Sequence, residues 1–154
     1  MKGDARVINR LNEVLAHELT SINRHFADAR LCEDRGYERL WKRLSTQSIG
    51  EMKHADELIE RVTHLEGVPK VDRLGRVDLA DSIKKQFELD LGVEKNAVRI
   101  LRDAIKLCKS LGDDDSGGIL ESILADEEGH AHWLEAQLEL IEASGEADYL
   151  AKQF

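Results

Sequence analysis

Four glutamates recur along this 154-residue sequence at a spacing that predicts a shared site. Two pairs of them are each separated by 33 positions, and the second pair repeats the first after 76 positions. Two of the glutamates are followed three residues later by a histidine, which on a helix puts carboxylate and imidazole on one face. Carboxylate oxygen and imidazole nitrogen without a thiolate favour iron or manganese over a structural zinc site. The six residues are Glu18, Glu51, His54, Glu94, Glu127 and His130.

Long segments of helical periodicity carry these residues. Each of four long segments has an apolar stripe with steps of three and four residues, and one of the glutamates interrupts each stripe near its middle. The glutamates are therefore expected to face the interior that these helices share. Glycine-rich breaks predict helices at about 5 to 35, 38 to 66, 82 to 111 and 116 to 144, with a short one at 146 to 152.

Helix ends and connections predict the topology. Asp4 and Asp81 can cap the first and third helices, and Asp115 or Ser116 can cap the fourth. The connection at 67–80 is long for a bundle, whereas the first and third connections are short. We therefore predict an all-α, ferritin-like four-helix bundle with a long crossover between the second and third helices and a short fifth C-terminal helix. Its length is that of a single domain covering residues 1–154.

Four carboxylates in an apolar interior require cations. Without them the charges repel one another and lose hydration, so the groups protonate or the bundle unfolds. Two divalent ions balance the four negative charges, and this ligand set is typical of di-iron bundles. We expect Glu51 and Glu127 to bridge two iron ions, Glu18 and Glu94 to be terminal ligands, and His54 and His130 to bind one ion each.

Composition excludes several classes of partner. A net charge of −9 disfavours nucleic acid and anionic lipid as ligands. No apolar segment approaches the roughly 20 residues that span a bilayer, and the start lacks the apolar core of a signal peptide, so we expect a cytoplasmic protein without a membrane partner. Cys32 and Cys108 have no CxxC spacing and are expected to be buried or half-buried free thiols.

Short motifs around the site add a family resemblance. They are MKGD at the start, Glu51-Met52-Lys53-His54-Ala55-Asp56, Leu65-Glu66-Gly67-Val68-Pro69, Asp126-Glu127-Glu128-Gly129-His130, and Tyr149-Leu150 near the end. With these motifs the sequence resembles the bacterioferritin family over essentially its whole length. The resemblance implies an iron-storage ferroxidase that oxidises Fe(II) with oxygen or peroxide at its intrasubunit di-iron site. It also implies a homo-oligomeric shell of 24 subunits built from two-fold dimers and filled with ferric mineral, with a ferredoxin-type reductant as a partner for iron release.

Met52 is the residue through which the resemblance implies a second cofactor. The family binds haem b between two subunits through one methionine from each. Met52 follows Glu51 and so points about 100° away from the stripe, on a second stripe with Ile49 and Ile59. The alternative is ordinary interface packing by a flexible apolar side chain.

Four further histidines lie outside the six predicted ligand residues. His25 lies on the first stripe, where many members of the family have a tyrosine, and is either a ligand or hydrogen-bond partner of the site or an ordinary core histidine. His17, His64 and His132 lie off the stripes and are expected at the surface.

A di-iron peroxidase or oxygenase could use the same six ligands, but the sequence has no companion redox domain. A haem-carrying shell subunit with an idle metal site is the other rival, disfavoured by the complete ligand set.

Overall fold

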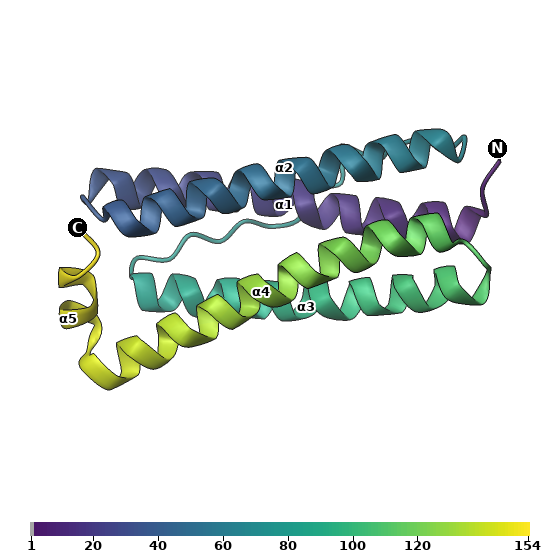
Figure 1. Ribbon diagram of the computed structural model, residues 1–154. Coiled ribbons are helices and arrows are strands. Elements are labelled where there is room, and N and C mark those ends of the chain that lie inside the picture. The colour runs from purple at the N-terminus through teal and green to yellow at the C-terminus, as the bar shows by residue number, and fades with distance from the viewer. Residues whose placement is uncertain (1) are drawn as a thin grey trace.

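The computed structural model describes residues 2–154, so Met1 of the MKGD motif lies outside the described residues. Helices α1 (Ala5–Asp34) and α2 (Glu38–His64) form one antiparallel hairpin, α3 (Ile83–Ser110) and α4 (Asp114–Ser144) form a second, and the short α5 (Glu146–Ala151) follows (Figure 1). The predicted four-helix bundle is confirmed, and its predicted helix limits are right to within two residues. Within residues 2–154, none of these helices is long and apolar enough to cross a membrane.

The crossover between α2 and α3 runs along the bundle and is fastened to α1 (Figure 1). The side-chain amide of Asn12 donates to the carbonyl of Val68 (3.1 Å) and accepts from the backbone N–H of Lys70 (2.8 Å). Farther along, Thr20 Oγ1 accepts from the backbone N–H of Gly75 (2.8 Å). These bonds satisfy backbone groups of a segment that has no helix or strand of its own.

The helix caps differ in part from those predicted. Asp4 accepts a hydrogen bond from the backbone N–H of Arg6 (2.8 Å), as predicted for the cap of α1. Ser82 caps α3, and Asp113, held by an ion pair with Arg61 (3.0 Å), caps α4. The predicted caps Asp81, Asp115 and Ser116 are wrong. Neighbouring Asp and Ser side chains are similar acceptors, so only a tertiary partner such as Arg61 decides which of them caps the helix.

Two apolar clusters fill the interior on either side of a polar band. The second cluster contains Phe87 and, from α5 at the end of the bundle, Tyr149. Cys32 and Cys108 lie in opposite clusters as buried free thiols, as predicted. The four glutamates lie in the polar band between the clusters and are shielded from water by both. The first cluster takes at least one buried leucine from each long helix: Leu11 and Leu15, Leu58, Leu101 and Leu120.

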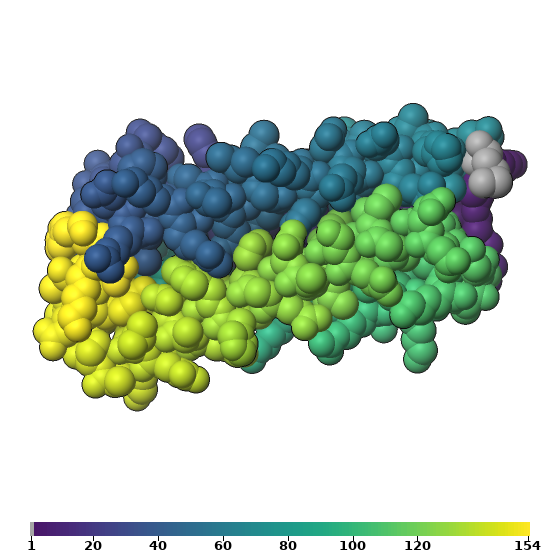
Figure 2. Space-filling view, in the orientation of Figure 1, coloured from purple at the N-terminus to yellow at the C-terminus, as the bar shows by residue number. Residues whose placement is uncertain are grey.

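Helix α5 packs across the end of the bundle next to the α1–α2 turn (Figure 2). The backbone N–H of Arg39 donates to the carbonyl of Gln153 (3.0 Å), and that of Lys84 donates to the carboxylate of Glu146 (3.1 Å). Gly145 joins α4 to α5 with a φ of 84°, a conformation that favours glycine. The predicted fifth helix therefore covers the end of the bundle at which α1 turns into α2 and α3 begins.

Candidate metal centre

The four predicted glutamates come together in the polar band, one from each long helix. Glu18, Glu51, Glu94 and Glu127 are each at most 1% exposed. As long as all four are ionised, one oxygen each of Glu18, Glu94 and Glu127 is buried without a hydrogen-bond donor. A buried carboxylate without a donor is strongly destabilising, so this arrangement calls for protons or cations.

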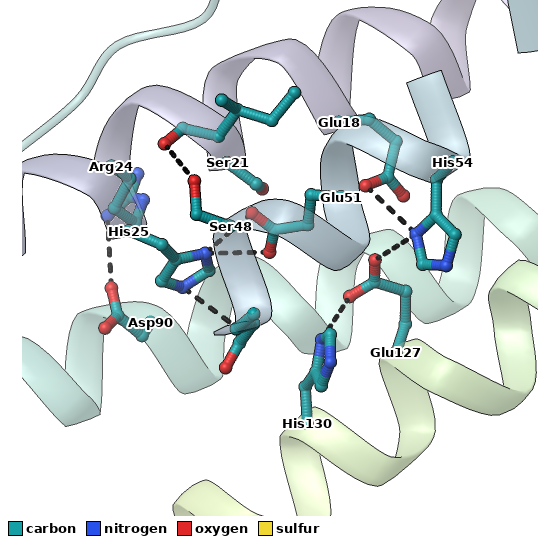
Figure 3. Close-up of polar contacts among 12 residues, drawn as sticks. Glu18, Ser21, Arg24, His25, Ser48, Glu51, His54, Asp90, Glu127 and His130 are labelled. Carbon is teal, nitrogen blue, oxygen red and sulfur yellow. Dashed lines mark hydrogen bonds and ion pairs between the residues drawn. The ribbon is translucent and has the colours of Figure 1, made fainter. Parts of the chain in front are cut away.

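The two predicted histidines face these carboxylates (Figure 3). Nδ1 of His54 lies 3.4 Å from Glu18 and 3.8 Å from Glu127, while its Nε2 contacts the carboxylate of Asp126 at 2.7 Å. Nδ1 of His130 lies 3.3 Å from Glu127. All six residues singled out by the sequence therefore lie in one site.

Three overlapping groups in this site could each hold a cation. Every group combines two carboxylates with one imidazole, and its ligand atoms all lie within 4.8 Å of one another. Such oxygen and nitrogen donor sets suit Fe(II), Mn(II) or Zn(II). The groups are Glu18 with His54 and Glu127, His25 with Glu51 and Glu94, and His17 with Glu94 and Glu127.

Mutual repulsion and burial determine the protonation of the glutamates. Burial raises the pKa of Glu18 and Glu94 well above the ordinary range, and the adjacent charge of Glu127 raises both further. Burial also opposes ionisation of Glu127, but hydrogen bonds with Glu94, His130 and Glu18 outweigh it and lower the pKa of Glu127. Protons on Glu18 and Glu94 thus compete with metal cations for the same oxygens.

His17 is a site residue that sequence reasoning misplaced. It was expected at the surface, but it is half-buried and its imidazole comes within reach of Glu94 and Glu127. Burial lowers the pKa of His17, which favours the neutral imidazole. A neutral imidazole has an unprotonated nitrogen that can bind a metal ion. A residue beside a stripe leans toward one flank of the helix, and only the packing of α3 on α1 shows that this flank is covered. His64 and His132 are exposed, as predicted.

His25 belongs to the site and is not an ordinary core histidine. Its Nδ1 faces both oxygens of Glu51, at 2.7 and 2.9 Å (Figure 3). Its Nε2 lies 3.3 Å from the amide nitrogen of Gln47. Burial lowers the pKa of His25, but the hydrogen bond and charge of Glu51 outweigh burial and raise it. Gln47 and Asp126, the polar partners of the two imidazoles, gave no signal in the sequence because they do not interrupt an apolar stripe.

A second buried polar cluster lies next to the metal centre. Arg24 contacts Asp90 at 3.5 Å and donates to the carbonyl of Arg76 in the crossover (3.4 Å), and the amide of Gln86 donates to Asp90 (2.9 Å). Asp28 has a buried oxygen without a partner. Burial and the charge of Asp90 raise the pKa of Asp28 to about 7.

Met52 lies apart from the metal centre, on the outer side of α2. Its side chain is 55% exposed and that of Ile49 is 54% exposed. Ile59, which was predicted on the same stripe, is half-buried and packs against the first apolar cluster. The outward apolar patch of α2 is thus formed by Ile49 and Met52 and does not extend to Ile59.

Comparisons with known proteins agree with this geometry. A family model described as a ferritin-like domain matches residues 8–144. The chain is 42% identical to the bacterioferritin of Streptomyces coelicolor over 151 residues, covering 98% of this chain and 90% of that protein. It is 40% identical to the bacterioferritin of Brucella melitensis over 149 residues, covering 97% and 92%. Identity to the bacterioferritin of Mycobacterium bovis is 38% over 152 residues, covering 99% and 96%.

Substitution of Asp28 by asparagine should remove a pH-dependent loss of stability. In the folded protein Asp28 faces Asp90, His25 and Arg24, and its pKa is about 7 against 3.8 for the ordinary group. The folded state therefore holds the proton more tightly, and stability falls as pH rises from about 4 to about 7. Between these limits Asp28→Asn should lose about 2–4 kcal/mol less than the wild-type protein. Denaturant unfolding of the metal-free protein between pH 5 and 8 measures this. Asp103→Asn, an exposed change on α3, is the control, and parallel pH profiles for all three proteins would contradict the prediction.

Proposed function

The chain belongs to the bacterioferritin family of ferritin-like proteins, and on that premise we propose that it oxidises Fe(II) in the cytoplasm and stores the ferric product. One observation of the structure carries the proposal: four carboxylates from four helices are buried together with too few hydrogen-bond donors. Two Fe(II) ions bring the four positive charges that balance them. The donor set fits iron, because carboxylate oxygens and imidazoles surround a water-excluded centre.

We assign the six ligand residues to the two proposed iron ions as follows. Glu127 shares one ligand group with Glu18 and another with Glu94, the two proposed terminal ligands, which supports a bridging role between the two ions. Glu51 is the proposed second bridge. Glu18 and His54 would complete the ligands of one ion, and Glu94 and His130 those of the other.

Oxidation balances with either oxidant that the resemblance implies. Two Fe(II) ions give two electrons, which with two protons reduce one hydrogen peroxide to two waters. Full reduction of one dioxygen to two waters takes four protons and the four electrons of two such pairs. The oxidised pair carries six positive charges against four carboxylates, and this imbalance favours release of iron to a store. On the protein side, His54 contacts Asp126, whose side chain is 58% exposed, so this carboxylate connects the buried imidazole with solvent.

A haem shared between two copies is the proposed second cofactor. The exposed thioether of Met52 and the adjacent Ile49 form an apolar patch that a partner's equivalent patch could cover with haem between them. Bound there through two methionine sulfurs, haem would supply electron transfer. Electrons from a ferredoxin-type reductant would then reach the mineral for iron release.

Exposed apolar side chains support assembly into a shell. On α1 and α2 they include Phe26 (65% exposed), Ile49 and Met52, and along the crossover Val71 (57%) and Leu74 (54%). Large apolar side chains exposed on these neighbouring elements would be covered by a partner subunit. We propose a homo-oligomeric shell of 24 subunits built from two-fold dimers.

Neither rival function gains support from the structure. An oxygenase or peroxidase acting on an organic molecule needs a pocket at the metal centre, but two surface cavities of about 440 Å³, one near Lys2 and Asp113 and one beside α5, are lined by residues other than the four glutamates. An idle metal site does not explain why all six ligand residues lie together and exclude water.

Removal of a bridging carboxylate should abolish fast iron oxidation. Glu51→Ala or Glu127→Ala leaves one ion poorly held, and the initial rate at two Fe(II) per subunit should fall at least about tenfold. Both variants should still fold, because the apolar clusters on either side of the site are unchanged. Glu128→Ala, next to Glu127 but exposed, is the matched control. Stopped-flow absorbance of ferric iron measures the rate, and fast oxidation by either variant would disprove the assigned centre.

Loss of the Met52 sulfur should separate haem binding from iron oxidation. Met52→Leu keeps the volume and apolarity of the patch, so the shell should form and oxidise Fe(II) at the wild-type rate. Haem absorbance should disappear, and stored iron should be released more slowly to an external reductant. Ile49→Leu, which retains Met52, is the control. Stoichiometric haem in Met52→Leu would show that another residue is the ligand.

The purified protein should be a large, monodisperse particle. Twenty-four chains of 17.4 kDa should elute together in size exclusion with light scattering at neutral pH and moderate salt. Ile49→Lys places a charge in the covered patch and should give smaller species, whereas Ile49→Leu should assemble normally. A stable wild-type monomer would rule out the shell.

A further inference from the structure

His25 is placed like a ligand although it is not among the six predicted ligand residues. It lies on α1, and its side chain is 2% exposed. Nδ1 points at the carboxylate of Glu51, and the other ring nitrogen is held by Gln47 from α2. One nitrogen of the imidazole therefore points toward the metal centre, and the other contacts a polar side chain on the far side of the ring.

His54 has the same arrangement on the other side of the centre. Its Nδ1 points toward Glu18 and Glu127, and its Nε2 is held by Asp126. Histidines that bind metals are typically oriented in this way, with the second nitrogen fixed by a polar group. The structure thus presents two imidazoles with equivalent orientation. His54 was predicted as a ligand, whereas the sequence left His25 open as a ligand, a hydrogen-bond partner or a core histidine.

Each of these imidazoles also completes a separate three-ligand group. His54 joins Glu18 and Glu127, and His25 joins Glu51 and Glu94, with all donor atoms of a group within 4.8 Å. Atoms bound to one cation at about 2.0–2.2 Å lie no more than about 4.4 Å apart. A small contraction of either group therefore gives a bonded geometry. The two groups share no residue, so both can be occupied together.

We propose that His25 is a metal ligand whose Nδ1 binds the second cation together with Glu51 and Glu94. The inference rests on the proposed function and deepens it, since it adds a third imidazole to the pair of ions. The ligand class is a divalent transition metal such as Fe(II), Co(II) or Zn(II). His130 keeps its place near Glu127 and binds the same cation from α4.

Gln47 allows His25 to serve both the metal-free and the metal-bound state. In the neutral ring without metal, the Nδ1–H of His25 donates to Glu51, and Nε2 accepts from the amide N–H of Gln47. With metal on Nδ1, the ring proton moves to Nε2 and donates to the amide oxygen of Gln47. An amide offers a donor and an acceptor, and a rotation about its last bond exchanges them.

Cobalt titration with a conservative variant separates a ligand from a hydrogen-bond partner. His25→Gln can still donate a hydrogen bond to Glu51 but has no imidazole. The assembled wild-type protein, prepared free of iron, should bind two Co(II) per subunit in the buried centre, followed by visible absorbance and calorimetry. In His25→Gln the first Co(II) should bind normally and the second at least about tenfold more weakly. His132→Gln, an exposed change on α4, is the matched control and should bind both ions normally.

Anomalous diffraction from Co(II)-loaded crystals locates each ion directly. If His25 is a ligand, one Co(II) ion should lie about 2.1 Å from its Nδ1. It is overturned if both ions lie more than 3 Å from that atom, roughly hydrogen-bond distance, or if His25→Gln binds the second Co(II) as tightly as the wild type. Wild-type protein that takes up no Co(II) among the four glutamates would refute the proposed function as well. Two tightly bound ions with an indifferent His25→Gln would refute only the role of His25.

Discussion

The burial of four carboxylates in one helical bundle is the constraint on which the rest of this structure depends. Water cannot reach Glu18, Glu51, Glu94 or Glu127, so their charges must be balanced from within. Apolar clusters on both sides fix the four helices at the height where these side chains meet. Because helices packed in this way cannot move apart without exposing leucines, the carboxylates stay close whether or not a cation is present. The apolar packing therefore supplies the preorganisation on which metal binding relies.

Helix α1 serves two tasks that interleave along its length. Asn12 and Thr20 hold the crossover, and Arg24 reaches both the crossover and Asp90. Between and beyond them, Glu18 and His25 face the metal centre. The long connection from α2 to α3 is thus linked through a single rigid helix to the position of two site residues. Order in the crossover and order in the centre depend on the same element.

The sequence predicted the features that break a periodic pattern and missed those that do not. Glu18 stood out because a carboxylate in an apolar helix stripe contradicts the pattern, and its three counterparts did so at matching positions. The helix order and limits followed from glycine breaks and from the length of the crossover. His17 was missed because its flank of α1 is covered only when α3 packs there. The caps Ser82 and Asp113 were missed because neighbouring side chains could accept the same bond, and for Asp113 the ion-pair partner, Arg61, is distant in sequence.

The offset of 76 positions has a consequence for the symmetry of the centre. It relates Glu18 to Glu94, Glu51 to Glu127 and His54 to His130, so the two hairpins repeat one design. His25 breaks the repeat, because the position related to it is Leu101, a member of the first apolar cluster. The two halves of the centre would therefore present unlike surroundings to the two proposed ions, although the ions themselves are chemically identical. A pseudo-two-fold site with such a polarity would distinguish its two proposed occupants by position, so that one ion would be held while the other exchanges.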